Sequence, residues 1–172
     1  MNLNMIRIAT FVDLSAIVSI YNEAVSSRFA TADITAVSVG ARRDWFTEHE
    51  PTRYPIYVWE DAGAVRAWCS LSPYRRGRMA LRFTAEISYY VQRDSQRKGI
   101  ASRLIRHAIL NCETLQIKNL FAIVLEPNMP SRSLLEKLGF ERWGLLPCVA
   151  DFDGQECGHV YYGQRLPWPN NN

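Results

Sequence analysis

The stretch Gln96-Arg97-Lys98-Gly99-Ile100-Ala101 combines donor side chains with small residues at a point where the chain is expected to turn. It follows an apolar, strand-like run that ends at Val91, and a helix-like run begins near Ser102. Glycine permits a turn without interference from a Cβ atom, so successive backbone N–H groups can converge on an anion. The positive end of the following helix adds to the attraction. This pattern predicts a cradle for a phosphate group.

Two common nucleotide-binding patterns do not fit this stretch. A P-loop needs two glycines that frame four residues before Lys-Ser/Thr, and a dinucleotide fingerprint needs three glycines at fixed spacing. Neither pattern occurs in the sequence. An ordinary loop before a helix gives the same letters, so the surrounding segments decide the interpretation.

Length and composition indicate one domain over residues 1–172. A hydrophobic content of 48% is enough to bury a core without disulfides or metal. Cys69, Cys112, Cys148 and Cys157 form no C-x-x-C pair and are typical of reduced thiols in a reducing compartment. No window reaches the roughly 18 apolar residues of a membrane span, and a net charge of +3 is too small to indicate nucleic-acid binding. We therefore expect a cytoplasmic protein that binds neither membrane nor nucleic acid.

The hydrophobic periodicity predicts strands mixed with helices. Strands are expected at 5–8, 56–60, 65–71, 81–91 and 120–125, with two more between 140 and 166. Helices are expected at 14–25, 42–49, 102–115 and 130–138. This order predicts an α/β (α+β) domain with a mixed central sheet of about six to seven strands, flanked by about four helices.

Two motifs resemble the GNAT superfamily of acetyl-CoA-dependent N-acetyltransferases. Gln96, Gly99 and Ala101 match its pyrophosphate pattern Gln/Arg-x-x-Gly-x-Gly/Ala. The segment 128–140 is similar to its closing motif, in which an asparagine, here Asn128, faces the cofactor and a helix ends at Leu-Gly-Phe. The resemblance implies a GNAT fold with acetyl-CoA as co-substrate. The implied phosphate contacts are Gln96, Arg97, Lys98, Gly99, Ile100, Ala101 and Ser102.

Other segments resemble one subgroup, the phosphinothricin and methionine sulfoximine acetyltransferases. The segment 84–91 is similar to the central strand that carries a glutamate facing the acceptor amine, and the segments 20–25 and 43–46 are similar to acceptor-side helices. The resemblance implies direct acetyl transfer, without an acyl-enzyme, to a small amino acid or analogue. The stretch 150–155 lacks the Lys-His or Lys-Phe pair of phosphinothricin enzymes, so the sequence does not identify the acceptor.

Glu86 is the candidate general base that the resemblance implies. Acetyl transfer needs a neutral amine, so a group must accept a proton at or near attack. Glu86 is the one carboxylate in an otherwise apolar run, and burial would raise its pKa toward the useful range. The alternative is a glutamate that points to solvent or pairs with Arg82. Asn128 is the second catalytic candidate and is also compatible with a helix N-cap.

The resemblance also implies acetyl-CoA contacts at Tyr89, Tyr90, Val91 and Ser131, in addition to Asn128. A backbone N–H of the segment 89–91 could stabilise charge on the thioester oxygen if the strand separates from its neighbour. Tyr89 and Tyr90 point to opposite sides of a strand, so at most one of them can face the cofactor side. Many GNAT enzymes have a tyrosine that protonates the departing thiolate within the stretch that here reads Ser133-Leu134-Leu135. No side-chain general acid is therefore assigned.

The acceptor site is expected to combine basic side chains with parts of the first loop and the central strand. Arg75, Arg76 and Arg78 could hold an anionic acceptor by bidentate contacts, or could simply form a solvated loop. The resemblance places the other acceptor contacts at Phe29, Thr31, Glu86, Ile87 and Ser88. His49, His107 and His159 lack metal-ligand spacing, so neither a metal nor a catalytic role is assigned to them.

Three functions are compatible with these motifs. The favoured one is N-acetylation of a small amino acid or analogue such as methionine sulfoximine, methionine sulfone or phosphinothricin. The second retains the fold and the cofactor but acts on a polyamine, an aminoglycoside or a protein N-terminus. The third is a noncatalytic module that binds acyl-CoA. The resemblance also implies a homodimer, for which the aromatic segment around Tyr161 and Tyr162 could supply the interface or pack internally.

Overall fold

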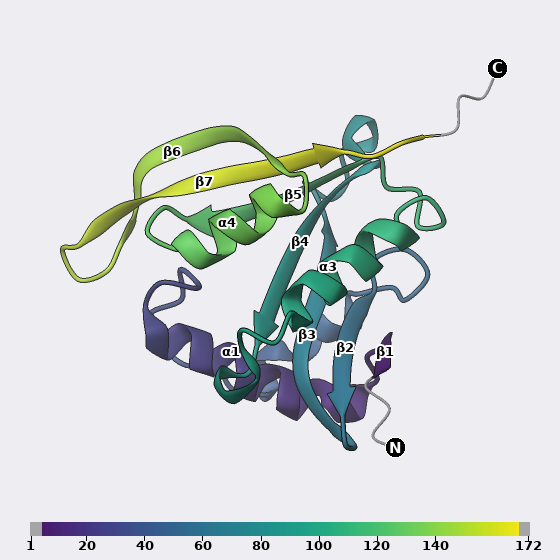
Figure 1. Cartoon of the computed structure of the whole chain (residues 1–172), viewed down its shortest axis with the longest axis horizontal. Coiled ribbons are helices and arrows are strands. Elements are labelled where there is room, and N and C mark those ends of the chain that lie inside the picture. Colours follow the sequence, from purple (N-terminus) through teal and green to yellow (C-terminus); the bar gives the residue numbers. More distant parts are fainter. Residues whose placement is uncertain (1–4, 169–172) are drawn as a thin grey trace.

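A seven-stranded mixed sheet is the centre of the fold in the computed structural model, which describes residues 5–168 (Figure 1). The strands follow the order β1-β2-β3-β4-β5-β7-β6 across the sheet. Their bounds are β1 Met5–Ile8, β2 Ile56–Asp61, β3 Ala64–Pro73, β4 Thr84–Val91, β5 Asn119–Leu125, β6 Glu141–Asp151 and β7 Glu156–Arg165. The helices are α1 Leu14–Ser27, α2 Arg43–Thr47, α3 Ile100–Asn111 and α4 Met129–Lys137. The predicted fold class is thus confirmed.

Three predicted boundaries are wrong for local reasons. Helix α3 begins at Ile100, not near Ser102, because Gly99 already stands in the left-handed region and starts the helix directly. It ends at Asn111 because the following residues form turns. Strand β4 begins at Thr84, not at 81, since a 3₁₀ turn occupies Met79–Leu81.

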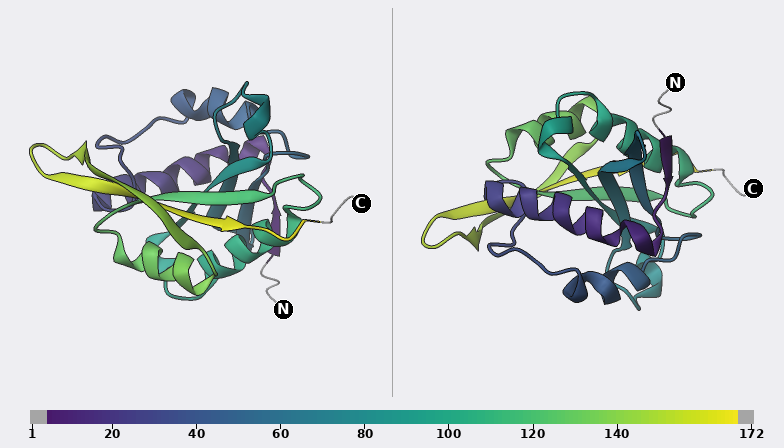
Figure 2. Two further views of the ribbon diagram at one scale, coloured as in Figure 1. Left: turned by 90° about the horizontal axis from the view of Figure 1, so that it is seen from above. Right: turned by 90° about the horizontal axis from the view of Figure 1, so that it is seen from below.

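The helices cover both faces of the sheet, α1 and α2 on one side and α3 and α4 on the other (Figure 2). On the first side, Ile17 and Ile20 of α1 pack against Val58 and Trp68. On the second side, Leu104 of α3 belongs to the larger core. Because side chains alternate along a strand, β4 contributes to both cores. This central strand is therefore held in place from both faces.

Strands β4 and β5 separate soon after they begin. They pair in parallel only at Thr84–Asn119, Ala85–Leu120 and Glu86–Phe121. Beyond Glu86 no ladder pair joins them, although β4 continues to Val91 and β5 to Leu125. The edge of β4 that faces β5 is therefore open over its second half, which is the condition for an unpaired backbone donor in the segment 89–91.

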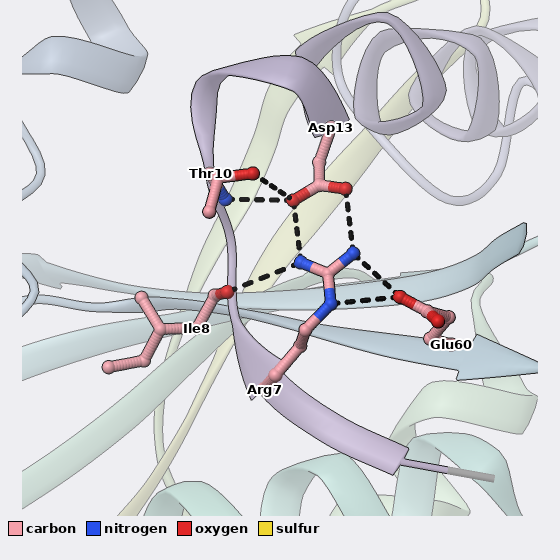
Figure 3. Close-up of polar contacts among 5 residues, drawn as sticks. All are labelled: Arg7, Ile8, Thr10, Asp13 and Glu60. Carbon is pink, nitrogen blue, oxygen red and sulfur yellow. Dashed lines mark hydrogen bonds and ion pairs between the residues drawn. The ribbon is translucent and has the colours of Figure 1, made fainter. Parts of the chain in front are cut away.

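An ion-pair cluster around Arg7 holds the first strand to the start of α1 (Figure 3). The guanidinium donates to Asp13 with N–O distances of 2.7 and 2.9 Å, and to Glu60 of β2 at 2.9 Å. Asp13 also accepts a hydrogen bond from the Thr10 amide at 2.7 Å, which is half of a capping box. The hydrogen bonds from Arg7 are the largest cause that lowers the pKa of the buried Asp13.

Two features that would indicate particular function classes, a membrane-spanning helix and a metal-binding cluster, are absent from the described residues 5–168. Among the helices within residues 5–168, none has both the length and the apolar character needed to cross a bilayer. Over the same residues, no group of three or more His, Cys, Asp or Glu side chains is arranged to hold a metal ion.

Candidate active site

The predicted phosphate cradle is a turn in which the amides at the start of α3 are left without backbone partners. Arg97 and Gly99 have φ angles of 60° and 77°, both in the left-handed region. The first bond of α3 runs from the Arg103 amide to the Gly99 carbonyl at 3.1 Å, so the amides of Ile100, Ala101 and Ser102 have no intrahelical acceptor. A Cβ atom at Gly99 would meet no atom within 4 Å, so the backbone conformation, and not packing, favours glycine there.

The polar side chains of the cradle mainly hold the loop in shape. Gln96 donates from Nε2 to the Val91 carbonyl at 3.2 Å, and Lys98 donates from Nζ to the Asp94 carbonyl at 2.9 Å. The Arg93 amide donates to the carboxylate of Glu23 in α1 at 2.6 Å, a link that the sequence did not indicate. The backbone amides, in a loop held by these contacts, are thus the groups best placed to bind an anion.

A narrow cleft of about 40 Å³ fills the space where β4 and β5 separate. It brings together residues of β4 and β5, the first turn of α4 and Ala30 of the loop after α1. Its lining from β4 and α4 consists of Ile87, Ser88, Tyr89, Tyr90, Asn128 and Ser131, all of them predicted contacts of acetyl-CoA or of the acceptor. Along β4 the lining residues begin directly after Glu86 and end one residue before Val91, the last residue of the strand before the cradle.

Glu86 is half-buried and directly precedes Ile87, the first residue of β4 that lines the cleft. It lies on the sheet face of Ser88 and Tyr90, where α1 and α2 pack. Burial raises the pKa of its carboxyl above the ordinary value, and no other cause contributes. Arg82 does not pair with it, because the Arg82 guanidinium donates to the Met79 carbonyl at 2.9 Å and covers the Phe83 ring. A carboxylate that is neither paired nor fully hydrated is suited to accept a proton.

Ser72 and His49 lie on the same face, and sequence analysis gave neither a role. Ser72 stands directly opposite Glu86 in the β3–β4 ladder, which places such Cβ atoms about 5 Å apart. The Nδ1 atom of His49 is 2.7 Å from the Trp45 carbonyl, and its Nε2 atom is 3.2 Å from the Ser72 hydroxyl. A carbonyl only accepts, so a neutral His49 carries its proton on Nδ1 and accepts from Ser72 at Nε2. No local pattern could have revealed this pair, since it joins the segment that follows α2 to β3.

Asn128 and Tyr89 line the cleft from its other side. Asn128 caps α4, since its Oδ1 accepts from the Ser131 amide at 3.2 Å. The Tyr89 hydroxyl is buried and has no hydrogen-bond partner among the described residues. The nearby Ser131 side chain does not complete a hydrogen bond to it, although it opposes the effect of burial on the Tyr89 pKa.

Tyr90 lies on the opposite face of β4 from Tyr89. Its ring packs on Tyr21 of α1 and on Trp68, at centroid distances of 5.0 and 4.7 Å. The two tyrosines therefore point to opposite sides, as the strand alternation predicts, and Tyr90 belongs to the smaller core.

The loop after α1 is held by a buried polar cluster. The Thr31 hydroxyl lies 2.8 Å from the Tyr21 hydroxyl, which donates to Asp33 at 2.6 Å. Asp33 in turn pairs with Arg42 at 3.3 Å. Thr31 is thus engaged in fixing the loop, whereas Phe29 is 56% exposed.

Ile87 is directed away from the acceptor face. Its side chain is 2% exposed and belongs to the core beneath α3. Its predicted acceptor contact can therefore involve only its backbone, whereas the neighbouring Ser88 faces the side of Glu86.

The predicted arginine cluster lines a separate cavity of about 220 Å³ at the β3–β4 connection, which Arg75, Arg76 and Arg78 share with Tyr54. Arg76 also borders a second cavity of about 200 Å³, lined in addition by Trp45, His49 and Ser72. Its guanidinium lies 3.8 Å from the exposed Glu48 carboxylate, a weak surface pair. Arg76 is thus the arginine that connects the cluster to the face of Glu86.

Two separating strands, an unpaired carboxylate on the first of them and a turn with free amides after it are the arrangement that suits an acyltransferase using a phosphate-bearing thioester. The chain belongs to the Acetyltransferase (GNAT) family, whose model matches residues 15–140. It is 40% identical over 162 residues to a Bacillus subtilis protein provisionally named phosphinothricin acetyltransferase, and the match covers 94% of this chain and 98% of that protein.

Two further relatives carry more specific names. The L-methionine sulfoximine/L-methionine sulfone acetyltransferase of Pseudomonas aeruginosa is 34% identical over 154 residues, covering 89% of this chain and 87% of that protein. A GNAT superfamily phosphinothricin acetyltransferase from Sinorhizobium meliloti, solved in complex with acetyl-CoA, is 29% identical with a TM-score of 0.88. That match covers 95% of this chain and 88% of the solved chain.

The site fits acetyl-CoA as a co-substrate. The amides of Ile100, Ala101 and Ser102 suit the charge of its phosphates. The open edge of β4 offers backbone groups to the amides of the pantetheine arm, as an added strand would. The enzyme is an acetyl-CoA-dependent N-acetyltransferase.

Proposed function

We propose that this enzyme transfers the acetyl group of acetyl-CoA directly to the amine of a small amino acid or analogue that carries an anionic group, of the methionine sulfone, methionine sulfoximine or phosphinothricin type. The observation that carries the proposal is the half-buried, unpaired Glu86 at the point where β4 and β5 separate. A neutral amine next to this carboxylate would attack the thioester carbon and lose its proton to Glu86, directly or through a water. The electron pair of the broken C–S bond would leave with the sulfur.

The anionic character of the acceptor is supported by the arginines around the site. Arg75, Arg76 and Arg78 surround one cavity, and Arg76 also borders the cavity that Ser72 lines. Arginine binds carboxylate and phosphinate groups in a bidentate manner. A polyamine or an aminoglycoside would meet repulsion from the same side chains.

A thiol-release assay with a panel of amines tests the proposal. The panel contains methionine sulfone, methionine sulfoximine, phosphinothricin, common amino acids, spermidine and an aminoglycoside. Turnover of the sulfone, the sulfoximine or phosphinothricin supports the proposal. Turnover of the cationic amines alone would assign another acceptor, and tight binding of acetyl-CoA without any turnover would favour a noncatalytic module.

The proposal includes a single cytoplasmic domain that forms a homodimer and binds no nucleic acid. The dimer is supported by the exposed apolar side chains of the edge strand β6, where Trp143, Leu146 and Val149 are about half exposed. Tyr162 is an unsuitable interface residue, because it is buried and donates to Glu136 at 2.7 Å. Light scattering at micromolar concentration measures the oligomeric state, and the finding of a monomer would refute the homodimer.

A further inference from the structure

The Tyr89 hydroxyl is a buried polar atom without an explanation in the fold. It has no hydrogen-bond partner among residues 5–168, although its oxygen is inaccessible to solvent. Leaving a buried hydroxyl unpaired costs about 1–3 kcal/mol. Such a group in a folded protein calls for a specific reason, for example a role toward a bound substrate.

The surroundings of this hydroxyl point to a ligand. Tyr89 lines the cleft between β4 and β5 together with Asn128 and Ser131. It follows Glu86 by three residues along β4, in the direction of the phosphate cradle. A thioester held with its phosphates at the cradle and its carbonyl carbon near Glu86 has its sulfur on the side of Tyr89. The base and this hydroxyl also approach from opposite faces of the strand.

We propose that the Tyr89 hydroxyl donates a hydrogen bond to the sulfur of the departing CoA thiolate. This inference rests on the proposed function and deepens it. It also gives the enzyme a hydrogen-bond donor for the thiolate. Helix α4 carries Leu134 and Leu135 in the stretch where many GNAT enzymes have a proton-donating tyrosine. Leu135 belongs to the larger core and Tyr89 packs against that core from β4, so the hydroxyl comes from the other side of the same core.

The role is that of a donor that retains its proton. Burial raises the pKa of Tyr89 to about 12, so the phenol is protonated at all pH values at which the enzyme is expected to work. A thiolate is a weaker base than the tyrosinate would be, and full proton transfer from Tyr89 is therefore unfavourable. The bond that forms joins the amine nitrogen to the carbonyl carbon, the C–S bond breaks, and the amine proton goes to Glu86. Tyr89 stabilises the charge that gathers on sulfur.

The test is Tyr89→Phe, which removes only the hydroxyl. A hydrogen bond to a charged group contributes about 1.5–3 kcal/mol, so kcat should fall about 10- to 100-fold. The single-turnover rate of thiol release should fall equally, and KM for acetyl-CoA should stay within about twofold, since the charge on sulfur exists only in the transition state. The midpoint of urea unfolding should not fall, because the lost hydroxyl has no partner in the free enzyme.

Tyr57→Phe is the matched control. Tyr57 is buried in the same core on β2, against the His107 ring, and has no assigned role. It should retain kcat. An unchanged kcat in Tyr89→Phe, or a higher KM with kcat retained, would overturn the inference while the acetyltransferase stands. A lowered unfolding midpoint accompanying the loss of activity would assign the hydroxyl a structural role and equally overturn it. Absence of wild-type turnover on the whole panel would overturn the proposed function, and this inference with it.

Discussion

Replacing Glu86 by glutamine should lower kcat about 100-fold while KM for acetyl-CoA is retained. Glutamine has the same shape and cannot accept the amine proton, so the variant removes the general base alone. Such a base contributes about 10²–10⁴ in rate, and a factor of 100 corresponds to about 2.7 kcal/mol of activation free energy. We expect the lower part of this range because Glu86 is only half-buried and water can replace it in part.

The pH dependence gives this prediction a second measurement. Burial raises the pKa of Glu86 in the folded enzyme, so kcat/KM for the acceptor should fall on the acid side of that raised pKa as the base becomes protonated. The part of the acid limb that Glu86 causes should be absent from the glutamine variant, whose residual rate falls in acid only because the amine becomes protonated. Thiol release at saturating acetyl-CoA over a range of pH measures both profiles.

The same substitution should not destabilise the protein at neutral pH. A carboxyl whose folded pKa is raised above its unfolded value stabilises the fold at low pH, and that contribution is lost as the pH rises through the folded pKa. Removing the charge should therefore leave the urea midpoint unchanged or higher. A glutamine variant with wild-type kcat at pH 7 would refute the assignment of Glu86 as the base.

Three other predictions concern the fold, the cradle and the acceptor. Asp13→Asn should destabilise the protein by about 2 kcal/mol at pH 7, because it weakens the charged hydrogen bonds from Arg7. The pKa of Asp13 is lower in the folded than in the unfolded protein. Its contribution to the free energy of unfolding is therefore present above the unfolded pKa of about 3.9 and is lost as the pH falls through the folded pKa. Urea unfolding of both proteins at pH 7 and pH 3 should therefore show a difference that shrinks in acid, and a constant difference would contradict this origin. Gly99→Val should raise KM for acetyl-CoA at least about tenfold, since a β-branched residue is strained at φ 77° and would displace the amides of the cradle. Gly63 in the β2–β3 turn has the same φ, and an added Cβ atom would meet no neighbour there. The Gly63→Val variant should therefore lose a similar amount of stability and retain the KM for acetyl-CoA. Equal KM values for the two variants would reject the cradle as the phosphate site. Arg76→Ala should raise KM for the acceptor and not for acetyl-CoA, as initial rates with each substrate varied would show, and an unchanged acceptor KM would remove Arg76 from the acceptor site.

Much of the fold could be predicted from the sequence because its elements depend on local patterns. The apolar run at 120–125 and the helical spacing of 14–21 are features of neighbouring residues, and both elements formed as expected. The boundaries that failed depend on single backbone conformations. A left-handed Gly99 and a 3₁₀ turn at Met79–Leu81 fix where α3 and β4 begin.

In the candidate site, too, local patterns in the sequence indicated some residues and only the tertiary structure brought others together. The phosphate cradle could be found in the sequence because its residues are consecutive and a glycine marks the required turn. Glu86 could be found as a lone carboxylate in an apolar strand. The pair formed by His49 and Ser72 could not, because it joins residues 23 positions apart whose contact depends on how α2 packs on β3.

The sequence by itself determined the class of the domain and, through its resemblance to the GNAT superfamily, indicated where the cradle and the candidate base lie. Only the tertiary structure decided that β4 and β5 separate after Glu86, that Ser72 stands opposite this residue, and that the Tyr89 hydroxyl is buried without a partner. The physical reason is that register and strand separation arise from pairing between distant segments. A shift of one residue would turn Glu86 and Tyr89 to the opposite faces of the sheet, and no local pattern records which register the packed helices select.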